Sequence, residues 1–240
     1  MLDSENEVIF LLGAGASVPA GINDMTSLIN DLIDSLKNNN NKEELEEVSG
    51  IKKNLEQWIE VNKLDKNVDI ELIMEAVDKL ENKKNEFIIN FCNDPEIKID
   101  LKNDKHLSKY IKQFIRIKCF TLQCKIDYFK YLMEFFSSDE LNIFSTNYDN
   151  AIEQFCEKYD IKCIDKIIPF PEDIQPTKFK KIINLYKLHG SITWWRNEQG
   201  DLINIPLINT SEVITTSLRI LAVPIILYPG KKIQYFQAFS

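Results

Sequence analysis

Three short polar segments of the chain carry residue types that can bind and cleave a nucleotide. Residues 13–17 read Gly-Ala-Gly-Ala-Ser, and small residues of this kind let a phosphate approach the backbone beside a helix N-terminus. Residues 146–149 supply an amide and a carboxylate, and residues 189–191 supply an imidazole. An amide can fix a ribose as donor and acceptor, and an imidazole with an ordinary pKa of about 6.5 can take a proton near neutral pH. Cleavage of a bond between a base and a ribose, which passes through an oxocarbenium-like state, needs both functions.

Each segment also has an ordinary structural explanation, and the residues alone leave both open. A small-residue turn after a first strand can simply reverse the chain. Asn147 and Asp149 are typical turn and helix-cap residues. A single histidine is more often a hydrogen-bonded core residue than a catalytic one, but the glycine after His189 in a strand-terminal turn favours a functional role.

The elements predicted around the three segments place them at one edge of a sheet. Apolar runs of strand length precede each segment, at residues 8–12, 141–145 and 182–188. In open parallel α/β sheets, ligands bind at the carboxyl ends of the strands, where loops and helix N-termini gather. A helix carrying Ile152 and Phe155 and a further strand within residues 161–168 are also predicted.

Helical periodicity dominates the stretch between the first two strands. Asp24 can cap a helix that begins near Met25, and amphipathic patterns predict the further helical segments 43–63, 67–80, 86–91 and 105–136. The last of these is one long periodic segment. We therefore expect an α/β fold, a three-layer Rossmann-like parallel sheet with a helical lobe inserted at about residues 38–137. The remainder, from Trp194 to Tyr228, favours strands whose pairing the pattern does not decide.

The composition of the chain disfavours several classes of partner and ligand. The net charge is -8 with no concentrated basic face, which disfavours direct nucleic-acid binding. The amino terminus is acidic, unlike a secretory signal, and the apolar run at residues 220–228 is too short for a membrane span, so we expect a cytoplasmic protein. Five cysteines without a CxxC pair indicate free, mostly buried thiols, and we expect no metal site.

In this order, the motifs resemble the sirtuin-like (silent information regulator) NAD-binding domain. The similar stretches are Gly13-Ala14-Gly15-Ala16-Ser17, Gly21-Ile22-Asn23-Asp24, Thr146-Asn147-Tyr148-Asp149 and Leu188-His189-Gly190. Val68-Asp69-Ile70-Glu71 and Tyr148 look more like the bacterial branch, the NAD-hydrolysing domains of antiphage defence systems, than like protein deacylases. The resemblance spans residues 8–190.

When the family's motifs are matched to this sequence position by position, the resemblance implies roles for individual residues. Asn147 would hold the nicotinamide ribose or a water, and His189 would be the general base. Asp24 and Asp149 would border the nicotinamide pocket. The residues expected to bind NAD are Gly13, Ala14, Gly15, Ser17, Asp24, Thr146 and Asp149.

The sequence departs from the deacylase pattern in three places. These departures concern the substrate of the enzyme and how much of the domain the sequence covers. The zinc module is missing, because no CxxC pairs are present, and residues 23–26 read Asn-Asp-Met-Thr where deacylases have Pro-Asp-Phe-Arg. The family pattern also implies a last Gly-Tyr-Ser-containing strand, which we expect beyond residue 240.

The resemblance implies an NAD hydrolase that releases nicotinamide and ADP-ribose and depletes NAD in a bacterial antiphage system. The alternatives are an NAD-dependent protein deacylase and a module that senses NAD or ADP-ribose without chemistry. The expected partners are NAD, a second copy or a partner subunit that gates activity, and a phage-derived trigger, with no membrane partner.

Overall fold

The computed structural model describes residues 8–81, 106–120, 125–136, 139–168, 180–196, 201–205 and 225–226. The predicted helix at 86–91 and the thiols of Cys92 and Cys124 lie outside these residues. The chain divides into two compact units. One holds the described residues of 8–22 and 116–226, and the other holds those of Asn23–Ile115.

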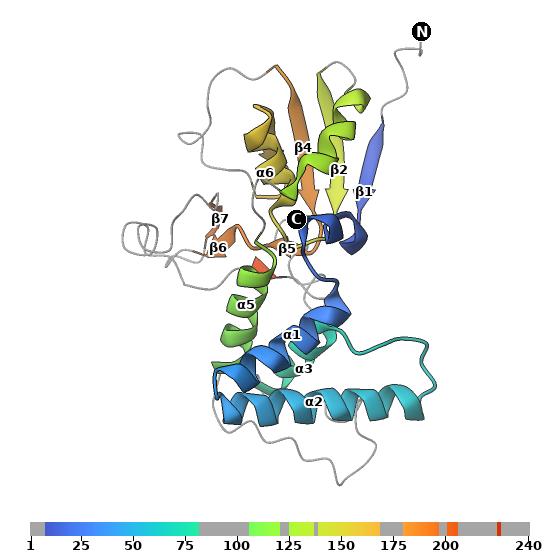
Figure 1. The fold of residues 1–240 in the computed structure, drawn as a ribbon, viewed down its shortest axis with the longest axis vertical. Coiled ribbons are helices and arrows are strands. Elements are labelled where there is room, and N and C mark those ends of the chain that lie inside the picture. The colour runs from blue at the N-terminus through green and yellow to red at the C-terminus, as the bar shows by residue number, and fades with distance from the viewer. Residues whose placement is uncertain are drawn as a thin grey trace. The chain divides into compact units, whose positions relative to one another are not determined.

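The first unit is built on a four-stranded parallel sheet in the order β1-β2-β4-β3, of which Figure 1 labels β1, β2 and β4 side by side. The strands are β1 (Ile9–Leu12), β2 (Glu140–Ser145), β3 (Lys162–Asp165) and β4 (Ile182–Lys187). Leu12 is in register with Ser145, and Ser145 with Lys187, so these three strands end at the same edge. The predicted strands and their shared edge are confirmed.

Alternation along the strands directs one row of apolar side chains into the core. Ile143 and Leu185 are fully buried against α6 (Ala151–Lys158), through Phe155, and against a 3-10 helix, η4 (Asp127–Phe135), through Phe129. Burying such a side chain stabilises the fold by about 1.5–3 kcal/mol. The expected α/β class, a Rossmann-like parallel sheet flanked by helices, is confirmed.

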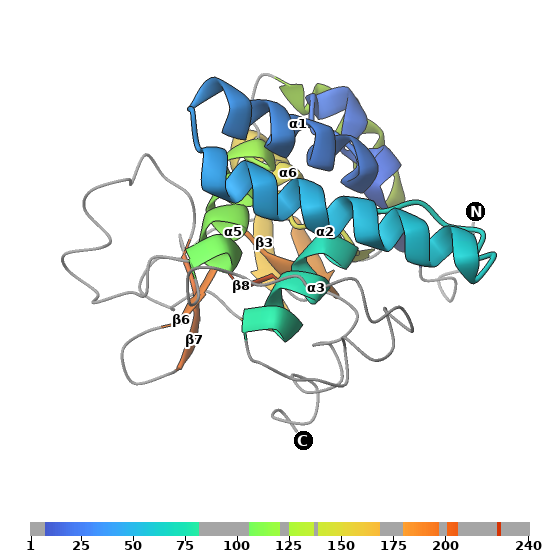
Figure 2. The same cartoon turned by 90° about the horizontal axis from the view of Figure 1, so that it is seen from below.

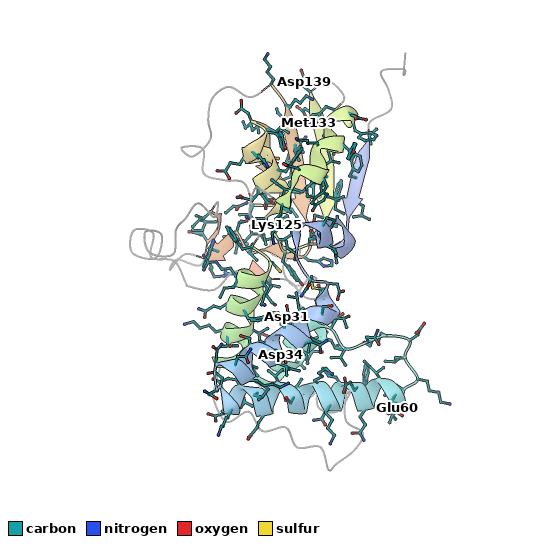
Figure 3. All side chains as sticks on the ribbon, viewed as in Figure 1. Asp31, Asp34, Glu60, Lys125, Met133 and Asp139 are labelled. Carbon is teal, nitrogen blue, oxygen red and sulfur yellow. The ribbon has the colours of Figure 1, made fainter. Side chains whose placement is uncertain are left out.

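Short 3-10 turns replace a regular helix after β1. Residues 14–16 form η1 (Ala14–Ala16) and residues 18–20 form η2 (Val18–Ala20). Gly21 closes η2 with φ +84°, and a Cβ there would also lie 3.1 Å from Nζ of Lys125, which Figure 3 labels. The positive φ therefore favours glycine at this position, and the end of the Lys125 side chain would have to move slightly to admit a Cβ.

Two short antiparallel pairs follow β4. They join β5 (Gly190–Ser191) with β8 (Ile225–Ile226), and β6 (Trp194–Arg196) with β7 (Leu202–Asn204). Gly190 has φ +86°, which allows the chain to turn directly after His189. Within the described part of residues 194–228 the β-leaning pattern gives strands, as expected, and the rest of that stretch, with Val213, lies outside the described residues.

The second unit consists of amphipathic helices. They are α1 (Met25–Asn38), α2 (Lys42–Val61), α3 (Ile70–Glu81) and α5 (His106–Lys118), whose last residues from Arg116 belong to the first unit. Helix α1 lies alongside α2 in both views (Figures 1 and 2), and each contacts α3. Fully buried side chains fill the contact, and they include Leu28, Leu32, Leu36, Val48, Ile51, Ile73 and Val77.

The predicted periodic segment 105–136 consists of two different elements. Helix α5 ends at Lys118, and η4 is a 3-10 helix. The buried residues Ile126, Phe129 and Leu132 recur every three positions, which is the period of a 3-10 helix. Because a period of three is close to 3.6, the sequence pattern does not distinguish this 3-10 helix from a continued α-helix.

The helical insertion expected at about residues 38–137 stays a prediction. The described residues of the second unit, Asn23–Ile115, include α1. Phe129 and Leu132 of η4 pack into the core of the sheet in the first unit. Among the described residues, no helix is both long and apolar enough to cross a membrane.

The N-cap of α1 provides a stability test. Asp24 accepts a hydrogen bond of 2.8 Å from the Ser27 amide, which lowers the pKa of its carboxyl. Asp24→Ala should lower the free energy of unfolding by about 1 kcal/mol, the usual loss for an N-cap side chain. Urea unfolding followed by circular dichroism measures it.

Two matched variants serve as controls. Asp24→Asn keeps a capping oxygen and should retain the stability. Asp34→Ala removes an exposed carboxylate that pairs with Lys37 on the same helix, and should change stability by less than about 0.5 kcal/mol. Equal losses for Asp24→Ala and Asp34→Ala would contradict the capping role.

Candidate functional site

Asn147 joins the turns that follow β1 and β2. Its side chain is only 5% exposed, and Nδ2 donates hydrogen bonds of 2.9 Å to the carbonyl of Gly13 and 2.9 Å to Oγ of Ser17. The backbone amide of Asn147 donates a hydrogen bond of 3.1 Å to Oγ of Ser145. The structure therefore brings together the first two predicted site segments.

Chemistry determines which way the Asn147 amide points. The Gly13 carbonyl can only accept, and Ser17 uses its own proton to donate to Oδ2 of Asp149 at 2.6 Å. Both partners of Asn147 must therefore receive hydrogens from NH2. With both amide hydrogens used within the protein, the side chain can engage a ligand only through Oδ1, as an acceptor.

Asp149 serves the turn and the helix at once. One carboxylate oxygen accepts from Ser17, and the other accepts from the amide of Ala151 at 3.0 Å, at the start of α6. The predicted cap role of Asp149 is thus real, and it coexists with its contact to the serine. A carboxylate with both oxygens engaged is held in one orientation.

The turn after β1 is anchored on both sides and keeps an open surface. The backbone amide of Thr146 donates a hydrogen bond of 3.0 Å to the carbonyl of Leu12, and the hydroxyl of Tyr128 donates one of 2.7 Å to the carbonyl of Ala16. Gly13 and Gly15 are exposed. A Cβ at Gly13 would come no closer than 3.9 Å to another atom, and one at Gly15 would meet nothing within 4 Å.

Glycine at these two positions is not explained by the chain itself. The φ of Gly13 is −108°, and Gly15 has no positive φ, so neither backbone conformation demands glycine. Missing side chains on an exposed, anchored turn leave room for the close approach of a ligand. This room suits the phosphate that the small-residue turn predicts, because a phosphate can then approach the backbone closely.

His189 lies beside the second turn. Its ring centroid is 6.4 Å from that of Tyr148, which directly follows Asn147, and its side chain is half-buried. The amide of Ile192 donates to the Tyr148 carbonyl at 3.0 Å and links the two turns through the backbone. The third predicted segment therefore neighbours the other two.

A buried lysine that the sequence analysis did not single out lies behind these turns. Lys187 is 2% exposed and ends β4, on the same face as the core residues Ile183 and Leu185. Its Nζ lies 2.9 Å from Oε1 of Glu153 and also donates to the carbonyl of Asp149. A lysine in the apolar row of a buried strand was the available signal.

The acid at the end of β3 has a structural role. Asp165 is 1% exposed and accepts from the amides of Ile167 and Ile168 and from the side chains of Trp194 and Asn204, at 2.6–3.0 Å. Burial raises the pKa of Asp165, and these bonds oppose that shift. With four donors around it, this carboxylate holds the β6–β7 pair and has no lone pair to offer a ribose.

Asp24 and the cysteine thiols are the remaining residues for which the sequence predicts a role or a state. Asp24 belongs to the helical unit, is exposed and caps α1, so a role towards NAD stays a prediction. Cys119, Cys156 and Cys163 are free, the first two buried, as expected, and burial raises the pKa of the Cys119 thiol. Among the described residues, no three His, Cys, Asp or Glu side chains gather in a way that could hold a metal ion.

A family model of the SIR2-like domain matches residues 141–218, about a third of the chain. No curated protein matches the chain. The matched segment contains Asn147, Asp149, Lys187 and His189, and SIR2-like domains are a family of NAD-using enzymes. The turn at residues 13–17 lies outside the match but is hydrogen-bonded to it through Asn147. The match indicates NAD-related activity.

Tyr128 provides a test of how the glycine turn is anchored. Burial and the charge of Asp149 raise the pKa of Tyr128 from 10.0 to about 12. The folded protein therefore holds this proton more tightly than the unfolded chain, and its stability should fall as the pH rises from 10 through 12. In a phenolate absorbance titration, Tyr128→Phe should remove a step near pH 12.

Tyr131→Phe is the matched control, because it removes an exposed tyrosine of the same 3-10 helix. It should leave the late step in place. A late step that survives Tyr128→Phe would rule out the assignment.

Proposed function

We propose that this domain hydrolyses NAD at the bond between nicotinamide and ribose, giving nicotinamide and ADP-ribose. One observation carries the proposal: a hydrogen-bonded chain from Gly13 through Asn147 and Ser17 to Asp149, at the carboxyl edge of the sheet and anchored in the SIR2-like segment. This edge is where parallel α/β sheets bind ligands.

Each residue has a defined task in the proposed reaction. The open turn at Gly13 and Gly15 receives the pyrophosphate. Asn147 accepts a hydrogen bond through Oδ1 from the nicotinamide ribose or from the attacking water. His189 takes the proton of that water as general base.

The bond changes balance without a further reactant. Water adds its oxygen to C1′ of the ribose as the bond to the nicotinamide nitrogen breaks. The electron pair of that bond passes to the ring nitrogen, which loses its positive charge. The proton from water goes to His189. The transition state is oxocarbenium-like, so ribose orientation by Asn147 lowers the barrier.

One observation favours a second candidate, binding of NAD or ADP-ribose without cleavage. The amide hydrogens of Asn147 and the hydroxyl proton of Ser17 are already engaged within the protein. Such a closed network suits a rigid binding surface as well as a catalyst. Calorimetry that detects NAD binding, with no nicotinamide release by the full chain, would favour this candidate.

The setting and the partners belong to the same proposal. NAD depletion in bacterial antiphage defence requires a domain that stays off until triggered, so we propose gating by self-association or by a partner subunit in response to a phage-derived signal. Activity assays should therefore include the full chain at high concentration. An acetylated peptide that yields O-acetyl-ADP-ribose would instead identify a deacylase.

The catalytic pair is tested by side-chain removal. Asn147→Ala and His189→Ala should each lower the turnover of NAD about a hundredfold, the usual scale for a positioned general base or orienting group. Chromatographic measurement of free nicotinamide gives the rate. His106→Ala removes the only other histidine, and Asn30→Ala removes an exposed asparagine, and both should leave turnover unchanged. Normal turnover of NAD by both Asn147→Ala and His189→Ala would contradict the proposed mechanism.

The open turn is tested by adding a methyl group. Gly15→Ala should change the free energy of unfolding by less than about 0.5 kcal/mol, because its Cβ meets nothing within 4 Å in the protein. The same methyl group would occupy space needed by the phosphates, so KM for NAD should rise about tenfold, an energy of about 1.4 kcal/mol.

Gly50→Ala is the matched control. Its Cβ also meets nothing within 4 Å, but it lies in α2, where alanine should stabilise the helix by up to about 1 kcal/mol. KM for NAD should stay unchanged. An unchanged KM for Gly15→Ala would mean that the phosphates do not approach this turn.

A further inference from the structure

Lys187 is a buried cation with three polar partners, one ion pair and two hydrogen-bond acceptors. Nζ lies 2.9 Å from Oε1 of Glu153, donates to the Asp149 carbonyl, and donates to Oγ of Ser191 at 3.2 Å. An isolated buried ammonium would be strongly destabilising, so its presence depends on all of these contacts. Lysine is the side chain with three donors and no acceptor.

The three partners come from three different segments. Asp149 lies in the turn after β2, Glu153 lies in α6, and Ser191 lies in β5, two residues after His189. Lys187 itself precedes His189 by two residues. One side chain therefore spans the distance between the turn that carries Asn147 and the turn that carries His189.

The charge of Lys187 is retained despite its burial. Burial alone would lower the pKa of Lys187, but the carboxylates of Glu153, Asp149 and Asp165 raise it above its ordinary value. The Ser191 hydroxyl, which accepts a hydrogen bond from Lys187, lies 2.8 Å from the Thr193 hydroxyl, which extends the network towards β6. The ammonium group of Lys187 is thus held in one position at this edge of the sheet.

The site depends on this position of the ammonium group through Asp149. The ammonium holds the backbone carbonyl of Asp149, whose side chain accepts from Ser17, and Ser17 in turn accepts from Asn147. A shift of Lys187 would therefore move Asp149 and, through Ser17, the amide of Asn147. The same shift would move Ser191 and the loop from His189.

We propose that Lys187 is a positioning residue for this site: its ammonium, paired with Glu153, sets the separation of Asn147 and His189 by joining the Asp149 carbonyl to the Ser191 hydroxyl. The inference rests on the proposed NAD hydrolysis for its catalytic consequence. Its geometric content can be measured without turnover. A misplacement of about 1 Å costs on the order of a hundredfold in rate, so the effect should be large.

The geometric test uses the chain's two histidines, His106 and His189. In Lys187→Met, the proton NMR resonance of Cε1–H of His189 should shift, while that of His106 stays in place. Lys181→Met removes a lysine just before the opposite end of β4 and should move neither resonance. An unmoved His189 resonance in Lys187→Met would overturn the proposal, whether or not the wild-type protein cleaves NAD.

The kinetic test separates positioning from stability. Lys187→Met should lower kcat for NAD about a hundredfold and change KM by less than about threefold, because Lys187 contacts the phosphate turn only through Asp149 and Ser17, whereas it directly holds the segments that carry Asn147 and His189. Lys187→Arg keeps the charge and should recover part of kcat.

A double variant keeps the test decisive if Lys187→Met unfolds. Lys187→Met with Glu153→Met replaces the buried ion pair by apolar side chains, which commonly preserves or raises stability. The double variant should melt near the wild-type temperature and still show the low kcat and the shifted His189 resonance. Recovery of both kcat and the resonance together with stability would show that Lys187 is only structural and would overturn the proposal.

If the full chain releases no nicotinamide even at high concentration, the proposed function fails, and the NMR measurement alone decides the role of Lys187.

Discussion

The hydroxyl of Ser17 is buried between an amide that donates to it and a carboxylate that accepts its proton. Because a buried polar group without a partner costs about 1–3 kcal/mol, each member of this chain is held in place by the needs of the next. Asn147 can satisfy its hydrogens only by facing the Gly13 carbonyl and Ser17. The side chains at the edge of β1 and β2 are therefore fixed before any ligand arrives.

A second constraint on the site comes from a buried ion pair beneath the turn of Asp149. The pair of Lys187 and Glu153 is buried in the same edge, and burial raises the pKa of Glu153. Such a pair contributes little net stability compared with apolar side chains, because desolvation offsets the attraction between the charges. Its retention at the point where β4, α6 and the Asp149 turn meet fits a requirement for geometry. Preorganised sites need this kind of support behind the residues that contact substrate.

Much of this arrangement was predictable from the chain. Apolar runs ending in polar turns placed Gly13, Asn147 and His189 at one sheet edge, because the carboxyl ends of parallel strands coincide. The cap at Asp24 and the helices of the second unit followed from periodicity. These signals are local, and the contacts they imply follow from the topology of parallel sheets.

Other features depend on contacts that a local pattern does not contain. The stripe at Ile126, Phe129 and Leu132 has the period of a 3-10 helix, and its destination, the sheet core, is a tertiary fact. The partners of Lys187 lie 4, 34 and 38 residues away, so the sequence could flag the buried lysine but not what it holds. The role of Asp165 likewise depends on four donors from residues that follow it in the chain, two of them on β6 and β7.

The central claim is that NAD lies across the turn at Gly13 and Gly15 with its nicotinamide ribose against Oδ1 of Asn147. The most direct measurement is a crystal structure of the full chain with carba-NAD, an analogue whose ribose oxygen is replaced by carbon so that the bond to nicotinamide resists hydrolysis. The account predicts the pyrophosphate on the exposed turn and a sugar hydroxyl or an ordered water that donates to Oδ1 of Asn147. A pyrophosphate bound away from that turn, or an Asn147 amide whose Oδ1 is covered by protein in the complex, would contradict it.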